Sequence, residues 1–589
     1  MRFFMKTKIM KLLLASLVLV LSANAKDGSV TLIHMGDIHG HLVPRINMRK
    51  SDPNYGVKVG GLAYVYDQIE KIRKEKPNNL LVNTGDTIQG SAEALYSYGS
   101  DMVTVLNEFE IDAFAPGNWD FIFGTRRFIE LFSARYGNKP LANWNTITAN
   151  LYYSTLYEFP ATPYASKAGT RVIKPYDVKV VGGVRIGIIG LAADRGPQAV
   201  STMVMDGFFL TPGEDELRDI IPVLKNQENC DLIILISERG LAGNLELVEY
   251  IPGIDVVLSS DMHEETHKVL VSKNGVLLVE EGQDGTMLGQ MDLVIKNKKI
   301  HSWKWKAHRI DVNNNKANPK IAKIIKEVRS KYVKGPSFHA HVNPINGAVL
   351  RTPIDTTIGY TRVPLHRSNF SDAKEMNAVI EGSSHDFLAD AFRSACHSDV
   401  GMIRGFRYGT HIAPGAIKLE DIYHFIPIGP QIACGEVSGD QLYWQIERNA
   451  HSSLTKYIGA WGGGWLGAFA GITYDLDPTK TYGNRITRLK VNGEMVDREK
   501  MYSIGGYWYM DDPGLINRMK ALKIKVLKTR RGGIVDAPEV VAHYLQTLPN
   551  HTVDPMLNRV NMLKPLPMRI GLNKEIQPLK GSPQPDGLE

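Results

Sequence analysis

The feature that most constrains this chain is a set of short polar segments, each of which directly follows an apolar run of strand type. The segments are Gly36–Gly40 (GDIHG), Gly85–Thr87 (GDT), Gly117–Asp120 (GNWD), Ser237–Arg239 (SER) and Ser260–Glu264 (SDMHE). A single Asp beside a Gly at a strand end is usually a turn former or a helix cap. Carboxylate, amide and imidazole groups at five strand ends in one chain are hard to explain by such structural needs. We therefore predict a metal site.

The segments lie in a region that alternates between apolar strands and amphipathic helices, from Ser29 to about Ile310. Helical periodicity covers Gly61–Lys74 and Ser100–Glu110. The expected strands are Thr31–Met35, Leu80–Asn83, Ala113–Pro116, Val184–Gly190, Asp231–Ser237 and Asp255–Ser259. This alternation indicates a layered α/β domain, and chemistry in such sheets collects at the carboxyl ends of the strands.

A chain of 589 residues is too long for one hydrophobic core, because such cores stop growing at about 250–300 residues. We expect a first domain over residues 26–315 and a second over residues 342–563. Between them, residues 316–341 are expected to form a connector with a basic helix over Asn318–Lys334, which Pro319 opens and Gly335-Pro336 ends. Residues 564–589, rich in Pro and polar side chains, are expected to be a surface tail.

The first 25 residues have the pattern of a signal peptide. Basic residues precede the short apolar run Leu12–Leu21, and Ala23-Asn24-Ala25 has the small-x-small pattern of a cleavage site. The run is too short for a membrane span of about 20 residues, so we expect export to the periplasm and no membrane anchor. Cleavage removes four of the cationic residues behind the net charge of +7, which leaves about +3. No basic stripe with aromatics is present, so nucleic acid is not an expected partner.

The chain has three cysteines, Cys230, Cys396 and Cys434, too few for a disulfide framework. Cys230 is expected to be a buried small hydrophobe. A bridge between Cys396 and Cys434 is possible, but the sequence does not decide it. We expect no catalytic cysteine.

The order of the motifs G-D-x-H-G, N-T-G-D-x-x-Q-G-S and P-G-N-W-D-F resembles the calcineurin-like metallophosphoesterases, specifically the two-domain 5′-nucleotidase superfamily. The resemblance continues in Ile380–Asp390 (IEGSSHDFLAD) and Met402–Arg407 (MIRGFR). It implies a four-layer metallophosphoesterase-type β-sandwich flanked by helices, followed by a smaller α/β C-terminal domain. Within the superfamily, the segments GNW, SERG, SSDMHE and EGSSHDFLAD are most similar to the SoxB family of periplasmic thiosulfohydrolases.

The resemblance also implies a set of ligands for two metal ions. Asp37 and His39 would bind one ion, Asp86 would bridge both, and Asn118 would bind the second. Glu238 and Asp261 stand where the nucleotidases have histidines, and His263 stands at the last ligand position. The alternative for Glu238 or Asp261 is a carboxylate that only hydrogen-bonds a ligand.

The ligand types indicate the metal and the charge of the substrate. Four carboxylates would balance two divalent ions, which suits an anion less charged than a phosphate monoester dianion, such as a sulfonate. Oxygen-rich ligands favour Mn²⁺ over zinc. We therefore expect two divalent ions, with Mn²⁺ the best fit.

Trp119 follows Asn118, where the phosphatases of this family have a histidine that assists the leaving oxygen. A tryptophan is a donor only and cannot titrate. A thiolate leaves more readily than an alkoxide, since thiol pKa values are near 8.5, so the missing histidine is tolerable for S–S hydrolysis. Trp119 could equally be a wall of the pocket. The resemblance makes Arg407 and Arg404 the candidates for anion binding, with Arg407 the better match, and His385 is expected to face the same cleft.

These expectations lead to one main function and two alternatives. The main prediction is a hydrolase in which water activated by two metal ions attacks a cysteine-S-thiosulfonate and releases sulfate. The resemblance implies a SoxYZ-type carrier protein that bears this substrate on a cysteine, and we expect the hydrolase to be a monomer. The alternatives are a periplasmic 5′-nucleotidase or 2′,3′-cyclic phosphodiesterase, and a metal-stabilised binding protein without catalysis.

Overall fold

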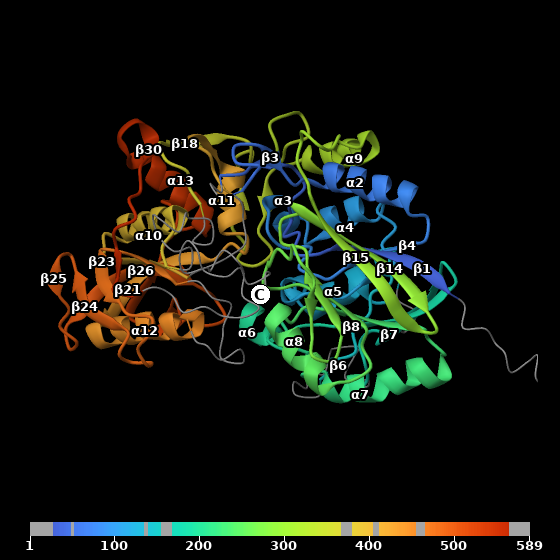
Figure 1. The fold of residues 1–589 in the computed structure, drawn as a ribbon. Coiled ribbons are helices and arrows are strands. Elements are labelled where there is room, and N and C mark those ends of the chain that lie inside the picture. Colours follow the sequence, from blue (N-terminus) through green and yellow to red (C-terminus); the bar gives the residue numbers. More distant parts are fainter. Residues whose placement is uncertain are drawn as a thin grey trace, which may run out of the picture.

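The structure is a computed structural model that describes residues 27–48, 52–134, 139–154, 168–366, 380–404, 411–454 and 466–564. It has two lobes, one built from the amino-terminal half of the chain and the other from the carboxyl-terminal half (Figure 1). The expected signal peptide, residues 1–25, and the expected tail beyond Lys564 lie outside the described residues.

The amino-terminal domain contains two sheets. The first has the order β15 (Lys299–Arg309), β14 (Met287–Lys296), β1 (Gly28–Met35), β4 (Asn79–Asn83) and β5 (Ala113–Phe114). The second has the order β12 (Leu270–Val271), β13 (Leu277–Glu280), β11 (Val256–Ser259), β10 (Leu232–Ser237), β8 (Val184–Leu191) and β7 (Tyr176–Val181). β1, β4 and β5 run parallel to one another, as do β8, β10, β11 and β13.

The sheets pack face to face and helices cover their outer faces. Leu32 and Ile234 lie in the core between the sheets, whereas their strand neighbours Ile33 and Ile233 pack against the outer helices. Strands buried on both faces need continuous apolar runs, which explains their sequences. The first sheet is covered by α2 (Leu62–Glu75), α4 (Ser100–Leu106) and α5 (Thr125–Phe132), and the second by α7 (Glu214–Pro222) and α8 (Leu241–Tyr250). The expected four-layer arrangement is confirmed.

The carboxyl-terminal domain is built around one five-stranded sheet. Its order is β22 (Ala468–Ala470), β19 (Val400–Ile403), β26 (Met501–Trp508), β21 (Gln431–Ser438) and β29 (Leu522–Val526). One face packs on α10 (Ser383–Cys396), α11 (Leu419–Phe425) and α13 (Ala537–Thr547). The other packs on α12 (Gly439–Leu454) and on a sheet of β25 (Glu494–Met495), β24 (Ile486–Val491), β23 (Ile472–Leu476) and β31 (Val560–Met562).

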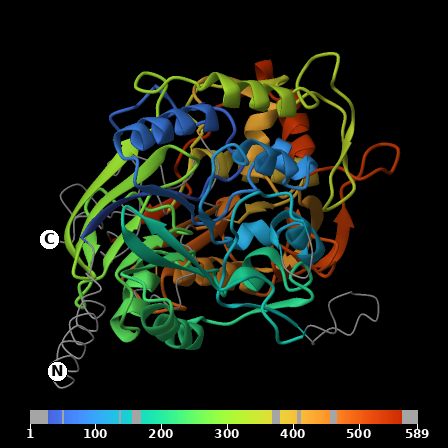
Figure 2. The same cartoon turned by 90° about the vertical axis from the view of Figure 1, so that its right-hand side faces the viewer.

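The connector helix is shorter than the sequence predicts. α9 spans Pro319–Arg329, and the side chain of Asn318 caps it by accepting hydrogen bonds from the first helical N–H groups. The helix ends before Lys334 because Tyr332 turns inward, where it is buried and donates to Asp101 Oδ2 at 2.8 Å. α9 lies along α2, on the outside of the first domain (Figures 1 and 2).

The two domains share buried apolar contacts. Leu95 and Tyr96 of α3 (Ala92–Tyr96) belong to the same buried cluster as the α10, α11 and α13 side chains. Met262, next to Asp261, packs into the cluster on the opposite face of the carboxyl-terminal sheet. The metal-type segments therefore lie close to the domain junction.

The cysteines are now placed. Cys396 at the end of α10 and Cys434 in β21 form a disulfide with a Cα–Cα distance of 5.4 Å, which settles the question that the sequence leaves open. Cys230 is buried as expected, and burial raises the pKa of its thiol to about 11. Over the described residues, no helix has both the length and the apolarity needed to cross a membrane.

Candidate metal centre

The metal-type segments meet because the strands before them end at the same edge of the two sheets. β1, β4 and β5 lead to the segments that begin at Gly36, Gly85 and Gly117, while β10 and β11 lead to those at Ser237 and Ser260. At these ends the backbone turns sharply. Asp37, His39, Asp86, Asp261 and His263 all have positive φ, between 43° and 88°. Positive φ in so many non-glycine residues is uncommon, and such strain gathers at functional sites.

Glycines make room for this crowding. A Cβ on Gly117 would lie 2.3 Å from Asp86 Oδ1 and 2.6 Å from Glu238 Oε1. Gly85 has φ +106°, and a Cβ there would lie 2.3 Å from the nitrogen of Gly117. The GD and GN pairs of the motifs are therefore required by close approach of the loops.

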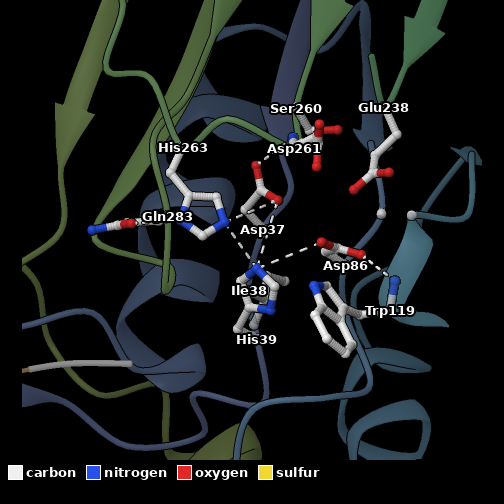
Figure 3. Close-up of polar contacts among 12 residues, drawn as sticks. Asp37, Ile38, His39, Asp86, Trp119, Glu238, Ser260, Asp261, His263 and Gln283 are labelled. Atoms are coloured by element: carbon white, nitrogen blue, oxygen red, sulfur yellow. Dashed lines mark hydrogen bonds and ion pairs between the residues drawn. The ribbon is translucent and has the colours of Figure 1, made fainter. Parts of the chain in front are cut away.

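Two overlapping groups of side chains have ligand atoms close enough to hold metal ions. Asp37, His39 and His263 form one group, and Asp37, Asp86 and Glu238 form the other; within each, the ligand atoms lie within 4.8 Å of one another. All five side chains are buried. Figure 3 shows them converging from separate loops on one small space. Two adjoining groups that share Asp37 are compatible with a two-metal site.

The two histidines are oriented by glutamines. Gln89 Oε1 lies 3.0 Å from Nδ1 of His39, and Gln283 Oε1 lies 2.7 Å from Nδ1 of His263. An amide oxygen only accepts, so each Nδ1 carries the proton and each Nε2 presents a lone pair. The two Nε2 atoms face each other at 2.9 Å. Two such lone pairs in one buried space fit a cation, and a partner that orients a ligating histidine in this way is usual.

The other side of the site is made of carboxylates and an amide. Nδ2 of Asn118 donates to Asp261 Oδ1 at 3.0 Å, and the backbone N–H of Asn118 donates to Glu238 Oε2 at 2.9 Å. Asn118 Oδ1 and Glu238 Oε1 have no hydrogen-bond partner within the described part of the chain, although both are buried. Buried acceptors without donors are costly, so these two oxygens also fit a cation.

Asp261 differs from the other predicted ligands. Its Oδ2 forms an ion pair with Nη2 of Arg195, and its Oδ1 accepts from Asn118. It stands outside the two groups above. Its role as a metal ligand stays a prediction, and the alternative role of hydrogen-bonding a ligand has a specific contact in its support.

The site gathers several buried carboxyl groups close to one another. Burial, followed by the neighbouring charge of Asp86, raises the pKa of Asp37 and of Glu238 well above the usual range of a carboxyl. Bound cations would reverse both effects, because a metal favours the ionised form of its ligands.

Trp119 lies at the edge of this site. Its backbone N–H donates to Asp86 Oδ1 at 2.8 Å, and its half-buried side chain also packs against the apolar core of the domain. Figure 3 shows the indole beside His39 and Asp86. The side chain next to Asn118 thus supplies no titratable proton, and its role as a wall of the pocket stays a prediction.

The predicted anion-binding residues lie in the carboxyl-terminal domain. Arg404 is half-buried at the end of β19. The nearby charge of Arg404, followed by burial, lowers the pKa of Arg518 to about 10. The charges of both arginines also oppose the rise that burial causes in the pKa of the half-buried Tyr509. Arg518 Nη2 in turn donates to the carbonyl of Gln198 in α6 (Gly196–Val200), at 3.0 Å. Two like charges held together beside the junction are suited to an anion.

Arg407 and His385 are the other two residues predicted to bind the substrate. Arg407 lies outside the described residues. His385 is buried in α10 and lines a cavity with Asp386, Tyr474 and Arg559 inside the carboxyl-terminal domain. The structure does not bring it into the two metal-type groups, and its role in substrate binding stays a prediction.

Several residues of the site were not predicted from the sequence. Gln89 belongs to the N-T-G-D-x-x-Q-G-S motif and could have been found there, whereas nothing in the sequence pointed to Gln283, Arg195 or Arg518. Each of these acts through a contact with a residue distant in sequence.

Comparison with known proteins identifies both domains. Residues 30–265 match the calcineurin-like phosphoesterase family, and residues 357–515 match the 5′-nucleotidase C-terminal domain. A probable 5′-nucleotidase of Treponema pallidum (strain Nichols) is 24% identical over 546 residues, which cover 82% of this chain and 86% of that protein.

Two solved structures share the fold over nearly the whole chain. The sulfate thiohydrolase SoxB of Thermus thermophilus, in complex with glycerol, has a TM-score of 0.74 at 17% identity and covers 92% of this chain and 98% of its own. A 5′-nucleotidase precursor, also of Thermus thermophilus, has a TM-score of 0.71 at 18% identity, with 91% and 99% covered. At these identities, the likeness shows the fold.

Proposed function

Because the chain belongs to the 5′-nucleotidase and calcineurin-like metallophosphoesterase superfamily, we propose that it is a two-metal hydrolase whose substrate is a cysteine-S-thiosulfonate. The products are sulfate and a sulfur anion that stays on the carrier cysteine. The observation that carries the choice of substrate is Trp119, which occupies the position of the leaving-group acid of the phosphatases and contacts Asp86 through its backbone.

The metal ligands in this proposal are Asp37, His39, Asp86, Asn118, Glu238 and His263, with Asp261 in contact with Asn118. Two bound divalent ions would lower the pKa of a water molecule and orient it for attack. Mn²⁺ is the proposed ion, because carboxylate and amide oxygens outnumber imidazole nitrogens in this set, and oxygen-rich sites suit harder ions.

The protein's own residues then position the substrate. Gln89 and Gln283 hold the imidazoles in one tautomer, so the site does not reorganise during the reaction. Arg404, beside Arg518, is suited to the sulfonate oxygens, and Arg407 is a further candidate. The attacking water's oxygen bonds to the sulfonate sulfur, the S–S bond breaks, and the departing sulfur needs no proton from position 119, since thiols are far stronger acids than alcohols.

The location and the partner follow from the substrate. We propose a periplasmic enzyme that acts on a SoxYZ-type carrier protein, whose cysteine-bearing segment would enter at the domain junction. A match to a 5′-nucleotidase precursor is compatible with an exported protein. The monomeric state remains part of the same proposal.

The second candidate is a 5′-nucleotidase, and the comparisons favour it by name. The curated relative from Treponema pallidum is a probable 5′-nucleotidase, and the match to the nucleotidase C-terminal domain spans residues 357–515.

The deciding experiment gives the Mn²⁺-loaded protein two substrates, AMP and a carrier-derived peptide with a cysteine-S-thiosulfonate. Our proposal expects sulfate release at ordinary enzymatic rates, on the order of 1–1000 per second, and little phosphate from AMP. Rapid phosphate release with no sulfate release would replace it with the nucleotidase. Loss of both reactions in an Asp86→Ala variant is the control for contaminating enzymes.

A further inference from the structure

Arg195 occupies the partly exposed side of the metal centre, which we call its entrance. It follows β8 and is the residue at which α6 begins. Its Nη2 pairs with Asp261 Oδ2 and lies 3.7 Å from the sulfur of Met262. The side chain of Arg195 is 30% exposed, whereas that of Asp261 is fully buried. The guanidinium therefore reaches from solvent to the carboxylates.

The position of α6 makes this entrance part of the domain junction. α6 packs against η1 (Asn118–Phe121), which carries Asn118 and Trp119. On the other side, Arg518 donates to the carbonyl of Gln198, and Ser201 Oγ donates to Asp511 Oδ2 at 3.0 Å. Figure 1 shows α6 between the two lobes. Arg195 therefore lies where the metal centre borders the domain junction.

The positive charge of Arg195 offsets part of the negative charge that Glu238 and Asp261 bring to the site. In the nucleotidase pattern that the resemblance implies, histidines stand at positions 238 and 261, and this chain has two carboxylates there. Arg195 interacts electrostatically with both. Four carboxylates and two divalent ions would balance, so Arg195 leaves the centre with one positive charge. One positive charge matches a monoanion such as a sulfonate. A phosphate monoester dianion is matched by the two surplus charges of a site with neutral histidines.

We propose that Arg195 is a substrate-binding residue, which Asp261 holds at the entrance so that its guanidinium binds the oxygens of a tetrahedral monoanion. The assignment of that monoanion as a sulfonate rests on the proposed function. The planar guanidinium donates paired N–H groups to oxyanions, which an ammonium group does not. The alternative is a purely structural arginine that only neutralises Asp261.

The test compares three variants of the Mn²⁺-loaded full chain: Arg195→Gln, Arg195→Lys and Arg239→Gln. Arg239 is the matched control, because it adjoins Glu238 in sequence but pairs with Glu214 Oε1 at 2.9 Å, outside the centre. The probes are methanesulfonate, a monoanion, and inorganic phosphate. Their dissociation constants are measured by calorimetry, and bound manganese is counted in each sample.

We expect Arg195→Gln to weaken methanesulfonate binding about tenfold or more, since one charged hydrogen-bonded contact contributes roughly 1.5–3 kcal/mol. Both manganese ions should remain. Arg195→Lys should recover part of the affinity, and Arg239→Gln should bind as the wild type does. Methanesulfonate binding that is unchanged in both Arg195 variants would overturn the proposal, and so would loss of manganese in both, because the arginine would then be structural.

The outcome is separable from that of the proposed function. Anion binding is measured without turnover, so an enzyme that hydrolyses AMP and not the thiosulfonate could still depend on Arg195. That result would reject the proposed substrate and keep Arg195 as an anion-binding residue. If Arg195→Gln fails to fold by circular dichroism, the Arg195→Lys variant alone decides: affinity within about twofold of the wild type contradicts the guanidinium's role.

Discussion

The two halves of the metal centre are built by different means. On one half, the proposed ligands His39 and His263 are imidazoles, and each is held by the amide oxygen of a buried glutamine. On the other, Glu238 and Asp261 are carboxyl groups, and they interact with Asn118 and Arg195. The histidine half is oriented by hydrogen bonds within one domain. The carboxylate half depends on α6, which also contacts the second domain.

The difference between the two halves indicates which residues can change the preference of the site for one anion over another. A histidine with a fixed tautomer sets the position of a metal. A neutral imidazole adds no charge to the centre. Each carboxylate alters the charge of the centre by one unit, and a nearby arginine can restore it. We infer that both halves hold the metals, whereas the carboxylate half also sets the net charge that an anion meets.

The largest expected effect comes from Asp86, which belongs to the group with Asp37 and Glu238 and also lies 3.6 Å from His39 Nε2. Asp86→Ala removes a carboxylate that lies between the two halves, so we expect loss of metal binding and of hydrolysis down to the level of the metal-free protein. Metal analysis and a sulfate-release assay measure this. Asp292→Asn, a change at a surface ion pair with Lys76, is the control.

The next effect separates the halves. Gln283→Ala leaves His263 in place but removes the acceptor that fixes its tautomer, and we expect manganese affinity to fall by about 10- to 100-fold. Calorimetric titration with Mn²⁺ measures it. Gln290→Ala is a close control, because Gln290 Oε1 lies 2.7 Å from Nε2 of His308, away from the centre. Equal losses in the two variants would mean that the effect is general destabilisation.

A smaller effect is expected from converting the carboxylate half towards the nucleotidase pattern. Glu238→His together with Asp261→His removes two negative charges, so binding of inorganic phosphate should strengthen relative to methanesulfonate. We expect the ratio of the two dissociation constants to shift by roughly tenfold, about 1.4 kcal/mol. An unchanged ratio would contradict the role of charge in this half. Retention of both manganese ions is the condition for the comparison.

The last expected effect, at the domain junction, is on the stability of the fold and its pH dependence. Burial raises the pKa of Asp536 to about 6, while Asn343 and Asn346 donate to its oxygens and Tyr96 of the first domain donates to Oδ2 at 3.4 Å. The folded-state pKa is above the unfolded value of about 3.9. The protonated carboxyl therefore stabilises the folded protein below about pH 4, and this contribution is lost as the pH rises through about 6.

Asp536→Asn should remove that dependence, which amounts to at most roughly 3 kcal/mol between these limits. Chemical denaturation at pH 4.5 and pH 7 gives the difference for each protein. The exposed Asp554, paired with Arg362 at 3.8 Å, provides the control variant Asp554→Asn. A wild-type pH dependence that persists unchanged in Asp536→Asn would show that other groups cause it.

The sequence predicted the ordered part of this architecture because its signals are local. Continuous apolar runs such as Asp231–Ser237 predicted strands, and β10 spans Leu232–Ser237. The GD and GN motifs predicted which strand ends carry polar groups, since close approach demands glycine at Gly85 and Gly117. The resemblance of these motifs predicted the fold of the first domain, and that of Ile380–Asp390 and Met402–Arg407 predicted the fold of the second.

The contacts between segments that are distant in the chain could not be predicted from the sequence. Gln283 and Arg195 reach the centre only through the folded loops, and no spacing relates them to His263 or Asp261. The end of α9 was placed too late because the burial of Tyr332 against Asp101 is a tertiary contact. The two roles considered for Asp261, metal ligand and hydrogen-bond partner of Asn118, differ in the positions of its carboxylate oxygens, which the residue type alone does not give.

The most direct test of the central claim is the number of divalent ions bound per chain. The protein is stripped of metal, titrated with Mn²⁺ and analysed by calorimetry and elemental analysis at pH 7.5. Two ions per wild-type chain, with fewer than one in Asp86→Ala, is the result that our account predicts. A single ion whose binding is indifferent to Asp86, or no binding at all, would contradict it.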